Sequence, residues 1–307
     1  IPLSEAQFRA NIDRCICVDQ DKNVFFLVDN DGKFAAFMLN EEADKLISLK
    51  SDINALFNSP VLGYNSKDDI VYQFWANRDS HEVYYFDPKT DYAPTTAISS
   101  ISWDDPNFPN IEGFGVWAAK CNFTMGPDGK MYSRMLGGNL VRIDVENARG
   151  ENLTNGDLVG TKDGRAYGLV FDPQDENVFY FSNNDKHCIY KYDLRTKECA
   201  CWAGQEGKSG YLDGPIGQAM FNKPGQMCVD SEGNIILTDT ENHCIRKITM
   251  STGYVSTLAG KPQNSGYVNG SAEDAQFKKP LGICIDNDDV MYIGDSENRA
   301  IRRLAVE

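Results

Sequence analysis

The three histidines of the chain, His81, His187 and His243, are the first side chains to consider for catalysis. Histidine changes its charge near neutral pH and is a common metal ligand, so three of them could serve acid–base chemistry or hold zinc. A catalytic or metal site requires such groups to converge. These three instead occupy one column of a repeated pattern, each at the start of a strand that follows a polar turn. This distribution predicts a structural role, in which each histidine fixes its turn.

The repeat behind this column is clearest in the last third of the chain. Residues 210–249 begin GYLDGPIGQAMFNKPGQMCVD and residues 266–304 begin GYVNGSAEDAQFKKPLGICID, which places Phe221 and Phe277 56 residues apart. A unit of apolar strand, polar turn and second strand recurs at residues 23–39, 71–87, 128–144, 177–193, 233–249 and 289–304. A fixed period of this size indicates a repeat architecture, and each unit has room for four short strands.

These six units predict an all-β fold, a six-bladed β-propeller with four antiparallel strands per blade. Residues 1–307 are expected to form one domain, and the blades are expected at roughly 1–57, 58–110, 111–160, 161–212, 213–268 and 269–307.

A second column, at the junction of strand and turn, is rich in oxygen-bearing side chains. Its members are Asp29, Asn77, Arg134, Asn183, Asp239 and Asp295. Carboxylate and amide oxygens are the ligands that calcium prefers, so a ring of them near one mouth of a central channel could bind this ion. Alternatively, each Asp or Asn accepts hydrogen bonds from its own turn. We favour the turn explanation, because a turn requirement predicts the same residue type in every repeat.

Residues that break the repeat are better candidates for ligand binding. Aromatic rings could stack on sugars, and arginines could bond to hydroxyls or carboxylates. By sequence alignment, Arg165 and Tyr167 stand where the fifth unit has Pro224 and Gln226. Replacing Trp75 or Arg134 by alanine is expected to abolish binding and leave stability nearly unchanged. Packing of irregular loops is the alternative explanation for the whole set, which comprises Trp75, Arg78, Trp117, Arg134, Arg165 and Tyr167.

Bulk composition excludes several functions. The net charge of −15 argues against a nucleic-acid partner, which requires a clustered positive surface. The nine cysteines include no CxxC pair, and several share repeat positions, so we expect small apolar fillers rather than a disulfide framework or a zinc site. No apolar run approaches the roughly 18 residues of a membrane span. No GxSxG, HExxH or phosphate-cradling motif is present in the sequence.

The motif around Asn242-His243-Cys244-Ile245 resembles the NHL repeat, together with Gly233-Asn234-Ile235 before it and Thr257-Leu258-Ala259-Gly260 after it. The match covers roughly the last 140 residues well. The whole chain looks like the NHL-repeat, TolB-like propellers of Bacteroidetes cell-envelope proteins, which often carry an upstream IPT/TIG domain. The resemblance implies a periplasmic or cell-surface location. It also permits calcium, as in lactonase-type propellers, or metal-binding histidines, as in propellers of the peptidyl-amidating lyase type.

The last unit ends just after its third strand, while the first begins almost at once with Ala6-x-Phe8, the counterpart of Ala275-x-Phe277. We therefore expect either a closing strand upstream of Ile1 in a longer parent chain or a sixth blade of three strands.

Two functions compete. The first is a binding module that presents one face to a glycan, peptide or protein partner. The second is a metal-dependent hydrolase, lactonase- or esterase-like, or a lyase, with its site at the central channel. A structural spacer is a third possibility.

Overall fold

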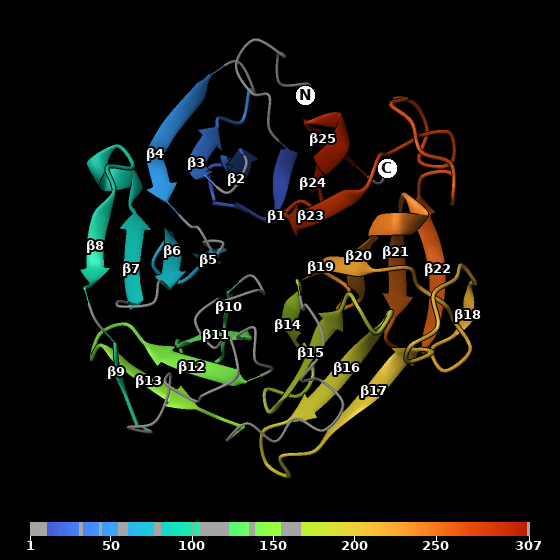
Figure 1. Ribbon diagram of the computed structural model, residues 1–307, viewed down its shortest axis with the longest axis horizontal. Coiled ribbons are helices and arrows are strands. Elements are labelled where there is room, and N and C mark those ends of the chain that lie inside the picture. Colours follow the sequence, from blue (N-terminus) through green and yellow to red (C-terminus); the bar gives the residue numbers. More distant parts are fainter. Residues whose placement is uncertain are drawn as a thin grey trace.

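The computed structural model describes residues 11–30, 33–42, 45–54, 61–76, 81–99, 101–104, 123–134, 139–154 and 167–305. Six sheets of mainly antiparallel strands stand around a central axis, which confirms the predicted six-bladed β-propeller (Figure 1). The first blade contains β1 (Asn11–Val18), β2 (Val24–Asn30), β3 (Lys33–Leu39) and β4 (Leu46–Asn54). The second contains β5 (Val61–Asn65), β6 (Ile70–Ala76), β7 (His81–Phe86) and β8 (Thr95–Ile98).

The third blade differs from the simple four-strand plan. It contains β10 (Thr124–Met125), β11 (Met131–Arg134), β12 (Leu140–Asp144) and β13 (Arg149–Asn152), and β9 (Ser102–Trp103) adds to its outer edge. Because β9 pairs in parallel with β13, it belongs to this sheet and not to the second blade, whose expected range was 58–110.

The last three blades follow the strong repeat. The fourth contains β14 (Leu169–Phe171), β15 (Val178–Asn183), β16 (Cys188–Asp193) and β17 (Cys199–Gly204). The fifth contains β19 (Pro224–Val229), β20 (Ile235–Asp239), β21 (Cys244–Thr249) and β22 (Tyr254–Ala259), with the short β18 (Gly214–Pro215) outside β22. Among the described residues the sixth has three strands, β23 (Pro280–Ile285), β24 (Met291–Asp295) and β25 (Ala300–Leu304). Three short 3-10 turns complete the elements: η1 (Pro88–Thr90), η2 (Thr240–Asn242) and η3 (Ser296–Asn298).

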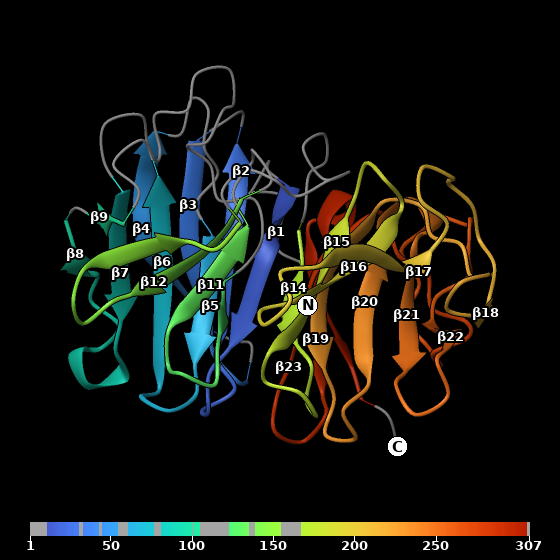
Figure 2. The ribbon, with the colours of Figure 1, turned by 90° about the horizontal axis from the view of Figure 1, so that it is seen from below.

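The inner strands β1, β5, β10, β14, β19 and β23 form a closed ring, in which each contacts the inner strands of both neighbouring blades. They run along the channel axis, as the side view in Figure 2 shows for β1, β5 and β19. Glycine allows the closest of these approaches. A Cβ on Gly63 would lie 2.5 Å from the Cβ of Phe123, and one on Gly225 would lie 2.7 Å from the Leu281 carbonyl oxygen.

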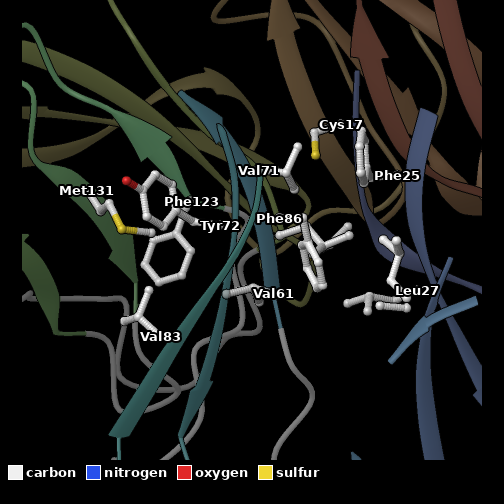
Figure 3. Close-up of a cluster of buried hydrophobic side chains, with 14 of the residues drawn as sticks. Cys17, Phe25, Leu27, Val61, Val71, Tyr72, Val83, Phe86, Phe123 and Met131 are labelled. Carbon is white, nitrogen blue, oxygen red and sulfur yellow. The ribbon is translucent and has the colours of Figure 1, made fainter. Parts of the chain in front are cut away.

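The core lies between the blades. Strands covered on both faces need apolar residues on both faces, and the second strands β2, β15 and β20 are almost wholly buried. One cluster joins the first three blades and includes Phe25, Val71 and Met131 (Figure 3). Four smaller clusters fill the remaining blade interfaces. This packing makes the propeller a rigid frame for whatever its loops and channel present.

Candidate functional site

The central channel holds a cavity of about 360 Å³ that all six inner strands line. Its walls are residues 16–18, 62–64, 123–124, 169–171, 226–229 and 283–285. Most of these side chains are apolar, so the cavity offers few polar groups for chemistry.

Gln226 is the one buried carboxamide in this channel wall among the described residues. Its Oε1 accepts hydrogen bonds from the backbone N–H groups of Ile16 at 3.1 Å and Ile283 at 3.2 Å. Its Nε2 donates to the Ile16 carbonyl at 2.8 Å. A side chain of the fifth blade thus binds the inner strands of the sixth and first blades, and its hydrogen-bonding capacity is used in closing the ring.

Three thiols, Cys17, Cys228 and Cys284, also line the cavity. Burial raises the pKa of each of them, so all three are neutral thiols at physiological pH. In the part of the chain that the structure describes, no three His, Cys, Asp or Glu side chains are grouped to hold a metal ion. The channel thiols therefore act as small apolar side chains.

Asp239 ends β20 and pairs with Pro224, the first residue of the inner strand β19. It is fully buried and bonded to three donors. Its Oδ1 accepts from the Asn222 N–H at 2.7 Å, and its Oδ2 accepts from Asn242 Nδ2 at 2.8 Å and an Arg246 guanidinium nitrogen at 2.7 Å. Burial raises the pKa of Asp239 to about 6, although Arg246 opposes this shift, so the carboxylate is ionised at neutral pH.

Asp295 repeats this arrangement in the sixth blade. It accepts from the Lys278 N–H at 2.7 Å, Asn298 Nδ2 at 2.8 Å and Arg302 at 2.9 Å. Burial raises its pKa as well. In both blades the carboxylate joins its turn to the loop that leads into the inner strand, and its oxygens are occupied by protein donors.

Arg246 and Arg302 are structural residues that sequence reasoning missed. The Arg246 guanidinium lies 4.9 Å from the ring centroid of Tyr211 and 5.2 Å from that of Phe221. Arg302 lies equally between Tyr267 at 4.9 Å and Phe277 at 5.0 Å. The signal was present in the sequence, because these arginines share the 56-residue period of the carboxylates that they bind.

Strand register removes two members, Asp29 and Arg134, from the predicted oxygen column. Asp239 stands four residues after Ile235, which pairs with Val229 at the end of the inner hairpin. Asp29 stands five residues after the equivalent Val24, and Arg134 three residues after the equivalent Met131. Because strand side chains alternate between faces, a shift of one residue turns a side chain to the opposite face.

In the second blade the expected Asn77 lies outside the described residues, and the pairing of its neighbours shows which residue takes the position of Asp239. In the fifth blade Cys244, which follows His243, pairs with Asp239. In the fourth blade Cys188, which follows His187, pairs with Asn183. In the second blade Glu82, which follows His81, pairs with Trp75. Only Asn183, Asp239 and Asp295 therefore share the register, and the residues of the predicted calcium ring do not fit a ring of oxygen ligands.

Two of the three histidines connect neighbouring blades. His187 Nδ1 accepts the backbone N–H of Lys223 at 3.1 Å, and His243 Nδ1 accepts that of Lys279 at 3.2 Å. Both histidines are in the left-handed region, with φ of 56° and 58°, at the end of the turn. Burial lowers the pKa of each imidazole, which keeps Nδ1 available as an acceptor. Each fixes its turn to the loop of the next blade; the side chain of His81 lies outside the described set.

Of the predicted ligand-binding residues, Arg78, Trp117 and Arg165 lie outside the described residues, and Trp75 is placed only by its backbone in β6. Arg134 is fully buried, with its guanidinium 5.7 Å from the ring centroid of Phe181.

Tyr167 is 8% exposed, and its N–H donates to Ser182 Oγ at 3.3 Å. The pairs Leu169↔Phe181 and Met227↔Leu237 place Gly168, not Tyr167, at the level of Gln226, so the alignment of Tyr167 with Gln226 was wrong by one residue.

Buried polar atoms that lack a hydrogen bond to any described residue occur on the same blades as these non-repeat residues. They include both amide atoms of Gln73, Oδ1 of Asn139 and Nδ2 of Asn183 in the second, third and fourth blades, and also Oγ1 of Thr240, Oδ1 of Asn242 and Nε of Arg246 in the fifth blade. In the fourth blade Asn183 stands at the position of Asp239. Tyr190, which pairs with Cys201, stands at the position of Arg246, which pairs with Thr257. The fourth blade has neutral side chains where the fifth has the ion pair of Asp239 and Arg246. The fourth blade therefore departs from the repeat in its buried polar groups.

The described residues contain no helix long and apolar enough to cross a membrane.

Comparison with known proteins agrees with this architecture. The NHL repeat model matches residues 221–248. The chain is 25% identical over 271 residues to the chloroplastic protein SUPPRESSOR OF QUENCHING 1 of Arabidopsis thaliana, covering 82% of this chain and 25% of that protein. It is 30% identical over 152 residues to NHL repeat-containing protein 2 of Gallus gallus, covering 49% of this chain and 19% of that protein. The chain thus spans a quarter or less of these curated relatives.

Solved structures of Bacteroides proteins share the fold. A structural genomics protein of Bacteroides thetaiotaomicron superposes with a TM-score of 0.81 at 23% identity, covering 100% of this chain and 72% of that one. An auxiliary nutrient binding protein of the same species superposes with a TM-score of 0.73 at 20% identity, covering 95% and 68%. A catalytically inactive histidine-to-alanine variant of virginiamycin B lyase from Staphylococcus aureus gives 0.58 at 14% identity over 100% and 98%.

Proposed function

We propose that this chain is a non-catalytic binding propeller of the bacterial cell envelope, which takes a polar, glycan-like ligand at the channel mouth formed by blades two to four. The observation that carries the proposal is the coincidence on these blades of two features. Gln73, the one described residue with two buried polar atoms that lack a hydrogen bond, and the Nδ2 of Asn183, which also lacks one, lie on the blades that carry the non-repeat aromatic and arginine residues.

The chemistry of the repeat positions supports binding over catalysis. Four acid–base groups of the column positions, Asp239, Asp295, His187 and His243, are each bonded within the blade framework. A catalytic acid or base must reach a substrate proton, and these groups already bond backbone N–H groups. The auxiliary nutrient binding proteins among the structural neighbours give independent support for a binding role and for an envelope location.

The test is a screen of oligosaccharides and short peptides against the full chain by titration calorimetry. Any ligand found should bind at least about tenfold more weakly to Trp75→Ala and to Arg78→Ala, since one aromatic or arginine contact contributes roughly 1–2 kcal/mol. Tyr254→Ala is the matched control, because Tyr254 is an aromatic residue of the fifth blade that is 46% exposed. Equal affinities of all four proteins would place the site elsewhere.

Arg134→Ala is not a suitable probe of binding. Because Arg134 is fully buried and stacks on Phe181, its removal is expected to destabilise the propeller, contrary to the sequence-based expectation of unchanged stability.

A further inference from the structure

Two thiols meet across the outer half of the fourth blade. Cys188 begins β16 and pairs with Gly204 on the outer strand β17, while Cys201 pairs with Tyr190. A bulge between these pairs brings Cys201 toward Gly204, and the Cys201 sulfur lies 3.8 Å from the Gly204 carbonyl oxygen. Since Gly204 is directly opposite Cys188, this geometry places the two sulfur atoms together on one face of the sheet.

The fifth blade shows that this pair is not a requirement of the repeat. It has the same bulge at the same place, between Ile245 and Arg246. Cys244 occupies the position of Cys188, but Thr257 stands opposite Arg246, where the fourth blade has Cys201 opposite Tyr190. The fifth blade therefore packs with a threonine at this position, and only the fourth of these two blades has a second thiol there.

The two thiols differ in character. Cys188 is fully buried, whereas Cys201 is partly exposed. A hydrogen bond between the two thiols lowers the pKa of Cys201 and raises that of Cys188. A thiolate is the nucleophile in thiol–disulfide exchange, and an accessible thiol of lowered pKa reacts first. Cys201 thus has the properties of an attacking thiol, and Cys188 those of a resolving thiol.

We propose that Cys201 and Cys188 form a redox modification site that reacts with low-molecular-weight disulfides and closes to an intramolecular disulfide across β16 and β17. In the first step the Cys201 sulfur attacks one sulfur of the disulfide, its S–S bond breaks, and one thiol leaves with the proton of Cys201. In the second step the Cys188 sulfur attacks Cys201, and the second thiol leaves with the proton of Cys188. Two protein thiols are oxidised and one disulfide is reduced to two thiols. This proposal does not depend on the proposed ligand-binding function.

Cys199 is the competing thiol, since it lies two residues from Cys201 on the same strand. It opposes Tyr192 rather than Cys188. Burial raises its pKa to about 12, so it remains protonated under conditions in which Cys201 reacts. Two cysteines at i and i+2 of one strand also have poor geometry for a disulfide.

The experiment uses oxidised glutathione on the full chain, followed by acid quenching, alkylation of remaining thiols and tryptic mass spectrometry. Trypsin releases Cys188 in residues 187–191 and Cys201 in residues 198–208, so the bridge appears as a cross-linked pair of these peptides. We expect this pair to accumulate, with two fewer alkylated thiols per chain.

The variants separate the two steps. Cys201→Thr, which installs the residue of the fifth blade, should prevent both glutathione attachment and the bridge. Cys188→Ser should stop at a glutathione adduct on residues 198–208, and Cys188→Ala provides the same test if serine is not tolerated at the buried site. Cys199→Ser should still form the bridge. Persistence of both alkylated peptides in the unsubstituted chain, or a bridge that survives Cys201→Thr, would overturn the proposal.

Discussion

Asp239 and Arg246 form an ion pair with 2.7 Å between carboxylate and guanidinium, and both side chains are fully inaccessible to solvent. A buried pair of this kind contributes little relative to apolar residues of the same shape, but removing one partner leaves an uncompensated charge. Arg246 also bonds Asp213 at 2.6 Å and the carbonyls of Met220 and Leu212, so it joins the turn of the fifth blade to the preceding loop. It is a structural clamp at a position where a catalytic or metal-binding carboxylate could be suspected.

Replacing Asp239 by Asn should lower the free energy of unfolding by about 3 kcal/mol, because the Arg246 charge loses its fully buried partner. Chemical denaturation measures this change. The fourth blade supplies the control, since it holds Asn183 and Tyr190 at these two positions. The double variant Asp239→Asn, Arg246→Tyr should therefore be more stable than Asp239→Asn alone. A double variant that is less stable would contradict the view that the pair acts as a unit.

The histidine contacts predict a dependence of stability on pH. The pKa of His187 and His243 is lowered in the folded protein, and the Nδ1 atoms must stay unprotonated to accept the Lys223 and Lys279 N–H groups. As pH falls below about 6.5, the unfolded chain binds protons that the folded one resists, so folding stability decreases until the folded-state pKa is reached. The measurement is the unfolding free energy at several pH values between 5 and 8.

The control is the double variant His187→Asn, His243→Asn, because asparagine tolerates the left-handed backbone and does not titrate. Its stability should change less over the same pH range. The pKa of Asp239, raised to about 6, acts in the opposite direction, since the folded state then binds the extra proton. That contribution is common to both proteins and cancels in their difference. An identical pH dependence of the two proteins would rule out the histidine contacts as its origin.

Most of the fold could be predicted from the sequence because polar residues that form the turns recur at a fixed spacing. Asp239, Asn242 and His243 each bond a neighbouring segment; Asp239 and Asn242 recur as Asp295 and Asn298 in the sixth blade, and His243 recurs as His187 in the fourth. These positions tolerate few alternatives, so their spacing could be read directly. Their structural role could be predicted for the same reason, since every repeat needs its turn.

The register of the first three blades could not be read in this way. Trp75 takes the place of Asp239 because β6 and β7 extend by one further pair, Ala76↔His81, and a longer hairpin displaces the polar column. Sequence alignment treats hairpin length as fixed, whereas strand pairing allows one residue more or less at each turn. The predicted oxygen ring and the alignment of Tyr167 with Gln226 failed for this reason. Arg246 was not predicted, although it recurs as Arg302 with the same 56-residue period as Asp239 and Asp295.

The broken oxygen ring predicts that calcium has no stabilising effect. Asp239 and Asp295 already accept three hydrogen bonds each, and Asp29 is out of register with them. A ligand that binds only the folded state raises the melting temperature in proportion to its occupancy. Millimolar calcium should therefore leave the melting temperature of the chain where it is in excess EDTA. A rise that Asp239→Asn abolishes would show that the column binds the ion after all.

Gln226 is expected to hold the propeller ring closed where the fifth, sixth and first blades meet. Gln226→Ala removes the acceptor of the Ile16 and Ile283 N–H groups and the donor to the Ile16 carbonyl. A buried polar group without a partner costs about 1–3 kcal/mol, and entry of water into the channel offsets part of that loss. The free energy of unfolding should fall by about 2 kcal/mol, whereas the exposed Gln218→Ala should change it little. Amide hydrogen exchange should accelerate at Ile16 and Ile283 and remain slow at Ile236, a buried residue of the second strand β20 away from this contact. Equal acceleration throughout the fifth blade would indicate general destabilisation in place of local opening at the junction of the three inner strands.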